Sequence, residues 1–379
     1  MTDSFDEAAR AALATTSDIE AGQVIERTIE LSLIAAPPLD EADRAERVAQ
    51  WWRADGLREV AMDQVGNVWA RVCEGRGPAV LIAAHLDTVF GRDIRHGLTH
   101  DGAGRLVGPG CGDDTVAVAA LSSLDRLMAA PTDRPVWIVA TVGEEGLGNL
   151  RGVTAALDRP LVPIGALIAL EGNYLGRVNL IGVGSVRKRV TVTAPGGHAW
   201  EDPHVPSAVH VAAEMIRDLG HLRVEHTAKV TVNVGTLHGG ESINARAQRC
   251  MFDLDLRSED PLALRSLTEG ATAILENVPP RVNVEIEEIG DRPAGRMDAD
   301  HPLVEAAAAS LRALGIEPRY TAASTDANAA YKLGIPAVTL GITYGDGTHT
   351  ETEWIEIQPV TLGLRALVTT IYTYISSGV

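Results

Sequence analysis

Five places along the chain put a histidine or a carboxylate directly after an apolar run or beside a glycine-rich turn. They are His85 with Asp87, Asp113, Glu144 with Glu145, Glu171, and His349. Imidazole nitrogens and carboxylate oxygens are common metal ligands, so two histidines with several carboxylates suit two divalent ions that share a bridging carboxylate. Each place alone is also compatible with a structural histidine or a solvated acid, and only the set as a whole favours a metal site.

The adjacent pair Glu144 and Glu145 follows the apolar run 136–143. Two neighbouring carboxylates at the end of a buried strand repel each other. The repulsion is relieved if one carboxylate binds a cation while the other is held, with a raised pKa, as a general base. The alternative is an acidic loop in solvent.

The glycine-rich segment Gly108–Asp114 opens a helical pattern at 115–130. Such a loop can bring a carboxylate close to a pair of metal ions. The alternative is that Asp113 or Asp114 is only the N-cap of the helix, because a carboxylate there accepts hydrogen bonds from free backbone N–H groups.

Strands and helices that the hydrophobic pattern predicts must position these residues. Near-continuous apolar runs are typical of strands covered on both faces, and four of them are 79–85, 136–143, 165–172 and 337–342. Helical patterns at 115–130 and 301–315 lie between them, and residues 22–57 form a helical stretch broken at Pro37 and Pro38. This order predicts α/β layering, in which sites form outside the carboxyl ends of the strands.

The middle of the chain has a different pattern. Alternating or strand-like segments and helical segments follow one another in the order 187–194, 205–220 (helical), 228–237, 249–257, 261–278 (helical) and 281–289. The order β-α-β-β-α-β is that of a ferredoxin-like unit. We therefore expect a catalytic domain of residues 1–184 and 291–379, with an inserted α+β domain of residues 185–290.

Charge and composition exclude several classes of function. The 379 residues include 33 Lys and Arg against 51 Asp and Glu, which gives a net charge of −18. Nucleic acid and anionic membrane both require basic patches, so neither is expected as a partner. The N-terminal sequence predicts no signal peptide, and no apolar run is long enough to span a membrane. Three separated cysteines without a CxxC motif indicate a reducing cytoplasm.

The ordered motifs HLDT, GxGDD, GEEG, LEG and HTxxE, with GGHA in the inserted segment, resemble one metallohydrolase family. That family contains glutamate carboxypeptidase, peptidase T, acetylornithine deacetylase, succinyl-diaminopimelate desuccinylase and aminoacylase. The resemblance runs from about Asp40 to the C-terminus. It implies a mixed-sheet di-metal hydrolase domain with a ferredoxin-like lid or dimerisation domain, and it implies a homodimer.

The resemblance also implies roles for individual residues of the catalytic domain. The expected metal ligands are His85, Asp113 as the bridge, Glu145, Glu171 and His349. Asp87 would orient His85, and Glu144 would be the general base. The ions would be zinc, with manganese or cobalt also compatible with carboxylate-rich ligation.

In the inserted domain, His198 of the GGHA motif matches the family histidine that steadies the oxyanion, often in the partner subunit's site. Asn244 and Arg257 match residues that hold a substrate carboxylate. Arg257 alternates onto one face with Asp255 and Asp253, so a solvated strand face is an equal alternative for it.

Three positions depart from the family pattern. Thr115 stands where a lysine is common, Ala247 stands where N-x-I-P has proline, and Ser324 stands where a glycine often precedes Thr-Asp. None of these changes removes an expected metal ligand. All three lie where substrate choice could be set, so the resemblance does not carry specificity over.

These observations predict a metal-dependent hydrolase that cleaves an amide bond of a small peptide or an N-acyl amino acid with a free carboxylate. An alternative on the same fold is hydrolytic deamination of a small, amino-acid-like and possibly aromatic compound. A non-catalytic binding protein would be expected to lack a ligand or the base, and none is lacking.

Overall fold

The computed structural model describes residues 7–15, 18–225 and 227–378. The chain divides into two compact units. Unit 1 is Met1–Gly182 with Arg296–Val379, and unit 2 is Val183–Gly295. The segment 185–290, expected from the sequence as the insert, lies within unit 2.

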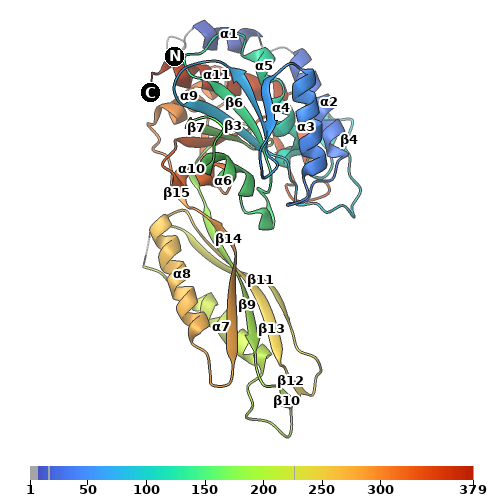
Figure 1. Ribbon diagram of the computed structural model, residues 1–379, viewed down its shortest axis with the longest axis vertical. Helices are drawn as coiled ribbons and strands as arrows, with labels where there is room; N and C mark the ends of the chain where they lie inside the picture. The colour runs from blue at the N-terminus through green and yellow to red at the C-terminus, as the bar shows by residue number, and fades with distance from the viewer. Residues whose placement is uncertain (1–6, 16–17, 226, 379) are drawn as a thin grey trace. The chain divides into compact units, whose positions relative to one another are not determined.

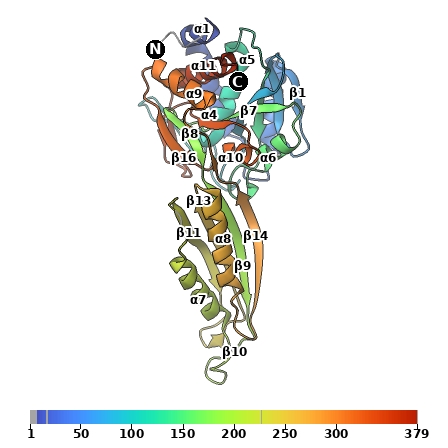
Figure 2. The ribbon, with the colours of Figure 1, turned by 90° about the vertical axis from the view of Figure 1, so that its left-hand side faces the viewer.

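Unit 1 is built around a mixed sheet whose strands are ordered β1-β2-β6-β3-β7-β17-β8, with β16 beside β8. Figure 1 labels β3, β6 and β7 of this sheet, and Figure 2 labels β1, β8 and β16. Their bounds are β1 Arg58–Met62, β2 Val68–Cys73, β3 Ala79–His85, β6 Val136–Thr141, β7 Ile164–Leu170, β8 Arg177–Gly182, β16 Arg319–Ala323 and β17 Ala337–Leu340. Strands β6, β3, β7 and β17 are parallel to one another. Strand β2 runs antiparallel to β1 and β6, and β8 runs antiparallel to β17 but parallel to β16. The four apolar runs of the sequence are these four parallel strands, as predicted.

Helices cover both faces of this sheet, which explains why its central strands are apolar throughout. The helices of unit 1 are α1 Glu7–Thr15, α2 Asp18–Ser32, α3 Ala42–Ala54, α4 Val116–Leu121, α5 Leu124–Leu127, α6 Arg151–Asp158, α9 Pro302–Ala313, α10 Ala327–Lys332 and α11 Val360–Ser376. In β3, Val80 and Ile82 pack into the core formed with α2, α4, α9 and α11. The alternate residues Leu81 and Ala83 pack with α6 and α10 on the other face. The break between α2 and α3 spans Pro37 and Pro38, as expected.

One helix prediction is wrong. The pattern at 115–130 predicts a single helix, but the structure has an irregular turn at Cys111–Thr115 followed by the short helices α4 and α5. Between those helices, the Ser123 hydroxyl donates to the carbonyl of Ala120, and the Ser122 hydroxyl accepts from the Trp52 indole N–H. Serine side chains compete with the helical hydrogen-bond ladder in this way, and apolar periodicity does not reveal it.

A small antiparallel sheet in unit 1 has the strand order β18-β19-β5-β4. Its strands are β4 Thr99–His100, β5 Arg105–Val107, β18 Gly345–Asp346 and β19 Trp354–Glu356. The residue before β19 is Glu353, whose carbonyl accepts the N–H of Gly108 at 2.8 Å. This sheet therefore ties the segment after β17 to the glycine-rich segment before α4.

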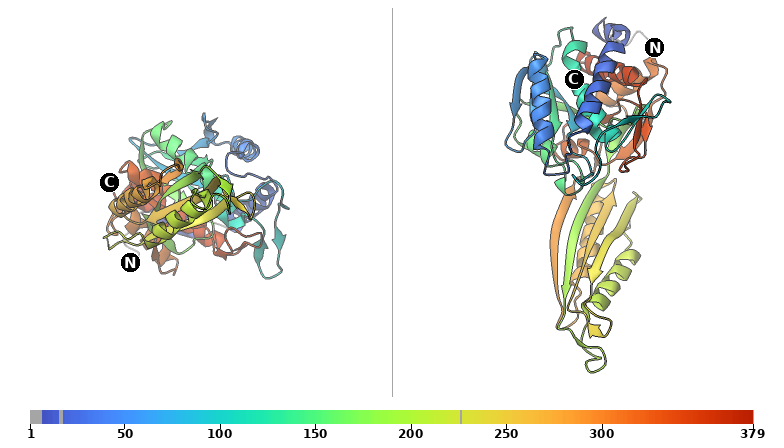
Figure 3. Two further views of the ribbon diagram at one scale, coloured as in Figure 1. Left: turned by 90° about the horizontal axis from the view of Figure 1, so that it is seen from below. Right: turned by 90° about the vertical axis from the view of Figure 1, so that its right-hand side faces the viewer.

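Unit 2 is a four-stranded antiparallel sheet of order β11-β13-β9-β14, with two helices on one face (Figures 2 and 3). The elements are β9 Gly184–Thr193, α7 Ala208–His221, β11 Val230–Gly239, β13 Arg249–Ser258, α8 Pro261–Glu276 and β14 Asn283–Arg292. Their order confirms the predicted β-α-β-β-α-β pattern. The two-residue strands β10 Gly197–His198 and β12 Ala245–Arg246 pair with each other, and β15 Gly295–Arg296 lies where the chain returns to unit 1.

No helix among the described residues has the length and apolar character needed to cross a bilayer.

Candidate metal centre

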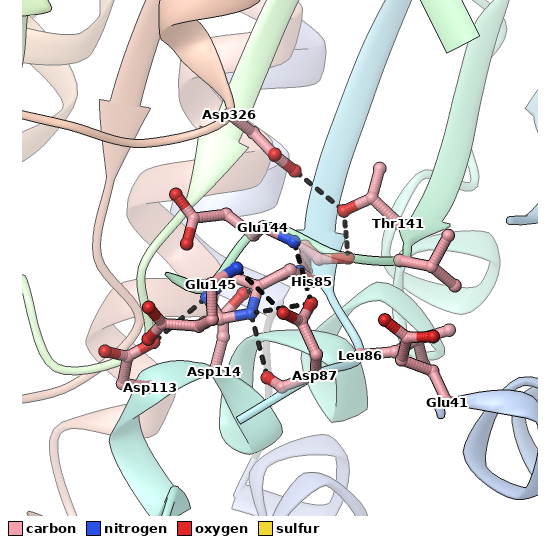
Figure 4. Close-up of polar contacts among 12 residues, drawn as sticks. Glu41, His85, Leu86, Asp87, Asp113, Asp114, Thr141, Glu144, Glu145 and Asp326 are labelled. Atoms are coloured by element: carbon pink, nitrogen blue, oxygen red, sulfur yellow. Dashed lines mark hydrogen bonds and ion pairs between the residues drawn. The ribbon is translucent and has the colours of Figure 1, made fainter. Parts of the chain in front are cut away.

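The predicted ligands and the predicted base of unit 1 gather where the parallel strands end. Figure 4 shows His85, Asp113, Glu144 and Glu145 of this group. Strand β3 lies between β6 and β7, so the residues that follow these three strands meet at one edge of the sheet. The turn Cys111–Thr115 and the loop after β17 reach the same edge. We call this group the strand-end cluster; its members are His85, Asp87, Asp113, Asp114, Glu144, Glu145, Glu171, His349 and Glu353.

Two sets of donor atoms in the cluster are spaced to hold metal ions. One set is His85, Asp113 and Glu171, the other is Asp113, Glu145 and His349, and within each set all ligand atoms lie within 4.8 Å of one another. The Asp113 carboxylate lies between the two imidazoles, with Oδ1 3.0 Å from His85 Nε2 and Oδ2 3.2 Å from His349 Nε2. The arrangement therefore offers two sites that share Asp113.

His85 is held in the orientation that a metal ligand requires. Its Nδ1 lies 2.9 Å from the backbone carbonyl of Asp87, so the Nδ1–H donates there and Nε2 is the nitrogen available to a metal ion. Nε2 is buried beside Asp113 without a well-formed hydrogen bond. Burial by itself would lower the pKa of His85, but the Asp113 and Asp87 carboxylates raise it well above its usual value. A cation is thus favoured at Nε2.

The Asp87 carboxylate contacts more than the histidine it is expected to orient. Its Oδ1 lies 3.6 Å from His85 Nδ1, and the Asp87 backbone carbonyl lies closer to that nitrogen. The carboxylate also accepts the backbone N–H groups of Glu144 at 3.0 Å and Glu145 at 2.8 Å. Strand β3 ends at His85, so the alternation that would place both side chains on one face does not continue.

Asp114, for which the sequence suggests no more than an N-cap, braces two strand ends. Its Oδ2 accepts the N–H of His85 at 3.0 Å, and its Oδ1 accepts the N–H of Gly172 at 2.9 Å. The helix that follows begins at Val116 without a side-chain cap, so the N-cap interpretation is wrong. Asp114 thereby holds the backbone of one predicted ligand and of the residue next to another, Glu171.

Glu353 holds the backbone of Asp113, the predicted bridging ligand, in the same way. Its Oε1 accepts the N–H groups of Gly112 at 3.0 Å and Asp113 at 2.9 Å. Burial, together with the negative charge of Asp113, raises the pKa of Glu353 to about 8. Glu353 is not among the residues predicted from the sequence, although it is the final residue of the HTxxE motif, which is the signal that could have identified it.

The cluster carries more buried negative charge than its imidazoles can neutralise. Burial and the charges of Asp113 and Asp114 raise the pKa of Glu171 well above its usual value. Hydrogen bonds to Asp113 and Glu145 raise the pKa of His349 to about 10, although its side chain is 53% exposed. These buried acids resist ionisation and the imidazoles hold protons. Divalent cations would take the place of those protons and balance the negative charge. The residues present fit such ions.

Glu144 lies at the centre of this arrangement and is almost fully buried. It follows Gly143, which has a φ of +65° and whose added Cβ would lie 3.3 Å from the Cα of Gly148. Only glycine allows this sharp turn without strain. The turn directs two successive carboxylates, Glu144 and Glu145, to the end of β6, and Asp87 fixes the backbone of both.

In unit 2, His198 and Asn244 lie next to each other. His198 pairs with Ala245 across β10 and β12, and the N–H of Ala199 donates to the Asn244 carbonyl at 2.9 Å. Both side chains are exposed, as are those of Trp200 and Ile243 beside them. We call residues 197–200 with 243–246 the β10–β12 tip.

Arg257 is on β13, with Asp253 and Asp255 on the same polar face, as the alternation predicts. Its guanidinium donates to the Asp255 carboxylate at 2.9 Å. It pairs with Ser185 at the end of the sheet where the chain enters unit 2, whereas the β10–β12 tip adjoins the other end. The eight residue-to-residue steps of β13 from Arg249 to Arg257 span about 26 Å. A single small substrate cannot contact Asn244 and Arg257 of the same chain.

Two of the departures from the family pattern have clear structural partners. The hydroxyl of Thr115 accepts a hydrogen bond from Nη1 of Arg44 at 3.2 Å. Ala247 is buried, its N–H donates to the Ser207 hydroxyl and its carbonyl accepts the N–H of Ala208. Both positions are therefore part of well-packed structure.

The sequence model described as peptidase family M20/M25/M40 matches residues 81–373. The chain belongs to this family. An acetylornithine deacetylase of Vibrio parahaemolyticus serotype O3:K6 is 26% identical over 315 residues, which cover 74% of this chain and 80% of that protein.

Solved structures of the family share the fold. A tripeptidase from Staphylococcus aureus subsp. aureus Mu50 matches with a TM-score of 0.79 at 21% identity, over 94% of this chain and 99% of that one. A dinuclear metal-binding M20 peptidase from Bacillus subtilis matches with a TM-score of 0.65 at 14% identity, over 94% of this chain and 98% of that one. The expected family resemblance and the mixed-sheet α/β fold are confirmed, and the M20/M25/M40 member described here is a hydrolase of C–N bonds.

Proposed function

We propose that this family member hydrolyses the amide bond of a short peptide or an N-acyl amino acid that carries a free carboxylate. The observation that carries the proposal is the pair of donor sets that share Asp113, with the buried carboxylate of Glu144 beside them. The names of its relatives, a deacetylase of acetylornithine and a tripeptidase, support an amide as the bond that is cleaved.

We assign the first ion to His85, Asp113 and Glu171 and the second to Asp113, Glu145 and His349. Zinc is our choice, because each set combines imidazole with carboxylate, and manganese or cobalt would suit the same ligands. Such ions would polarise the amide carbonyl and make water more acidic.

Glu144 is our choice for the general base. It takes a proton from the attacking water as the water oxygen bonds to the carbonyl carbon. It then gives that proton to the amine nitrogen as the C–N bond breaks, so one water is consumed and an acid and an amine leave. The N–H···carboxylate contact with Asp87 keeps the Glu144 backbone fixed during both transfers.

We propose that the protein acts as a homodimer in which the β10–β12 tip of one subunit completes the centre of the other. His198 would stabilise the oxyanion of the tetrahedral intermediate, and Asn244 would contact the substrate beside it. Because Arg257 lies about 26 Å along the sheet from the tip, it would bind the substrate carboxylate in a different subunit from His198.

We place the protein in the cytoplasm. All three cysteines lie in the described part of the chain, and each is free and buried, which suits a reducing compartment.

The test is to supply the zinc-loaded protein with dipeptides, tripeptides and N-acyl amino acids and to identify the products by mass spectrometry. We expect equal amounts of two products: an acid and an amino acid from an N-acyl amino acid, two amino acids from a dipeptide, and an amino acid and a dipeptide from a tripeptide. Glu144→Gln should lower this turnover by at least roughly 10²-fold. Release of ammonia without a second carbon-containing product would show deamination and contradict the proposal.

A further inference from the structure

Among the described residues outside the strand-end cluster, Arg44 in α3 has the most deeply buried charged side chain. It is 1% exposed. Its Nε donates to the carbonyl of Ile34 at 2.7 Å, and its Nη1 donates both to the carbonyl of Leu86 at 3.0 Å and to the hydroxyl of Thr115 at 3.2 Å. All three acceptors are neutral, so this guanidinium is buried without a carboxylate bonded to it.

Two of these acceptors belong to the segments that carry the predicted ligands. Leu86 lies between His85 and Asp87, and Thr115 lies two residues after Asp113. A single nitrogen, Nη1, therefore joins the end of β3 to the turn that supplies the shared carboxylate. The contact is made from the α3 side and uses backbone and hydroxyl oxygens, so it leaves every ligand atom free.

The positive charge of Arg44 also interacts with the negative charge of the cluster through Asp87. Burial lowers its pKa to about 10, and the negative charge of Asp87 opposes that change, so the group is a cation at neutral pH. A buried charge is costly, and an apolar side chain of similar volume commonly packs as well or better. Packing of α3 alone therefore does not account for an arginine at this position.

We propose that Arg44 is a positioning residue for the two-ion centre: it fixes His85, Asp87 and Asp113 relative to one another and offsets part of their negative charge. This inference rests on the proposed function, since it assumes that the cluster binds metal. Groups behind metal ligands commonly change metal affinity or activity by about 10- to 100-fold when they are removed.

The experiment measures Zn²⁺ affinity directly, by competition between the metal-free protein and a chromophoric chelator, with unfolding in urea as a parallel readout. For Arg44→Met we expect Zn²⁺ binding weakened by roughly 10- to 100-fold, and kcat lowered more than KM is raised. Arg44→Lys, which keeps the charge, should recover part of the loss. Thr115→Val, which removes one acceptor, should weaken binding by roughly 2- to 10-fold.

The matched control is Arg27→Met. Arg27 is in α2, is mostly buried, and donates to Asp55 at 2.7 Å, but it contacts no residue of the cluster. It should lower the urea midpoint while leaving Zn²⁺ affinity within about twofold of wild type, since the lost interaction is remote.

The results distinguish failure of the positioning role of Arg44 from failure of the proposed two-ion centre. If wild-type protein binds two Zn²⁺ ions and folded Arg44→Lys and Thr115→Val bind them as tightly, Arg44 is structural only and the inference is overturned, even where Arg44→Met does not fold. If wild-type protein binds no Zn²⁺, the proposed centre fails and this inference fails with it.

Discussion

The strand-end cluster of unit 1 and the β10–β12 tip of unit 2 both carry residues predicted to act in catalysis, but the chain holds them in opposite ways. In the cluster, carboxylates of Asp87, Asp114 and Glu353 each accept two backbone N–H groups, and nearly every side chain is buried. At the tip, His198 and Asn244 are exposed, and Trp200 beside them is 86% exposed.

The difference indicates that contacts within one chain hold the strand-end cluster firmly and the β10–β12 tip less firmly. The cluster is already organised within one chain and needs only cations to balance its charge. The tip has less support: the Asp202 carboxylate accepts one backbone N–H, that of His198, at 2.8 Å, and a tryptophan and an isoleucine, Trp200 and Ile243, lie in solvent. We therefore expect the tip to be completed by contact with another surface. The predictions below test this division between a preformed centre and an element completed on binding.

The largest effect is expected inside the cluster. Glu144→Gln should lower kcat by at least roughly 10²-fold, because the proton from water loses its acceptor, while Zn²⁺ binding and folding are kept. Steady-state kinetics with metal analysis would measure this. Glu351→Gln is the control, since that nearby glutamate is exposed and should leave kcat unchanged. Normal turnover by metal-loaded Glu144→Gln would remove Glu144 from the mechanism.

A somewhat smaller effect is expected at the tip. His198→Ala should lower kcat by roughly 10²-fold with little change in KM, because an oxyanion donor acts mainly in the transition state. If the tip serves a partner, a heterodimer of His198→Ala and Glu144→Ala subunits should regain part of the activity, since one of its centres is intact. Purified heterodimers without any recovery would show that the tip does not complete a partner's centre.

Arg257→Ala should mainly raise KM, by roughly 10- to 100-fold, if the guanidinium binds the substrate carboxylate in the ground state. The guanidinium already contacts Asp255, so Asp255→Asn should leave Arg257 freer and should not raise KM. Equal KM values for wild type and Arg257→Ala on carboxylate substrates would favour the solvated strand face, the alternative that the sequence left open.

The smallest effect separates the stabilities of the two units. Cys73 and Cys111 are buried in unit 1 and Cys250 in unit 2, and burial raises the pKa of Cys73 to about 11. Alkylation at pH 8 therefore reports opening of each unit. Zn²⁺ at about five times its Kd should slow labelling of the unit 1 thiols about sixfold and leave Cys250 unchanged. Asp113→Asn should abolish this protection; equal protection of Cys250 would contradict independent units.

The cluster could be predicted from the sequence because apolar runs indicate buried strands, and the carboxyl ends of parallel strands meet at one edge of the sheet. Thus His85, Glu145 and Glu171 are brought together as expected. The supporting contacts could not be predicted in this way. Asp114 and Glu353 act through hydrogen bonds to backbone groups as far as 241 positions away along the chain, and no local pattern encodes such contacts.

The tip and Arg257 show the same limit in unit 2. Alternation correctly assigns Arg257 to the polar face of β13, but it does not say at which end of the sheet a residue lies. The separation of Arg257 from Asn244 appears only when β13 is paired with β9. The contacts of Arg44 could not be predicted either. A helical pattern predicts which face of α3 is buried, but not which oxygen atoms will accept hydrogen bonds from a side chain on that face.

The most direct test of the central claim is a crystal structure of the zinc-loaded protein with anomalous difference maps at the zinc edge. We predict two peaks roughly 3.5–4 Å apart, one on each side of the Asp113 carboxylate, with His85 and Glu171 on the first ion and Glu145 and His349 on the second. Peaks remote from these five residues, or a single fully occupied ion that Asp113 does not contact, would contradict the account.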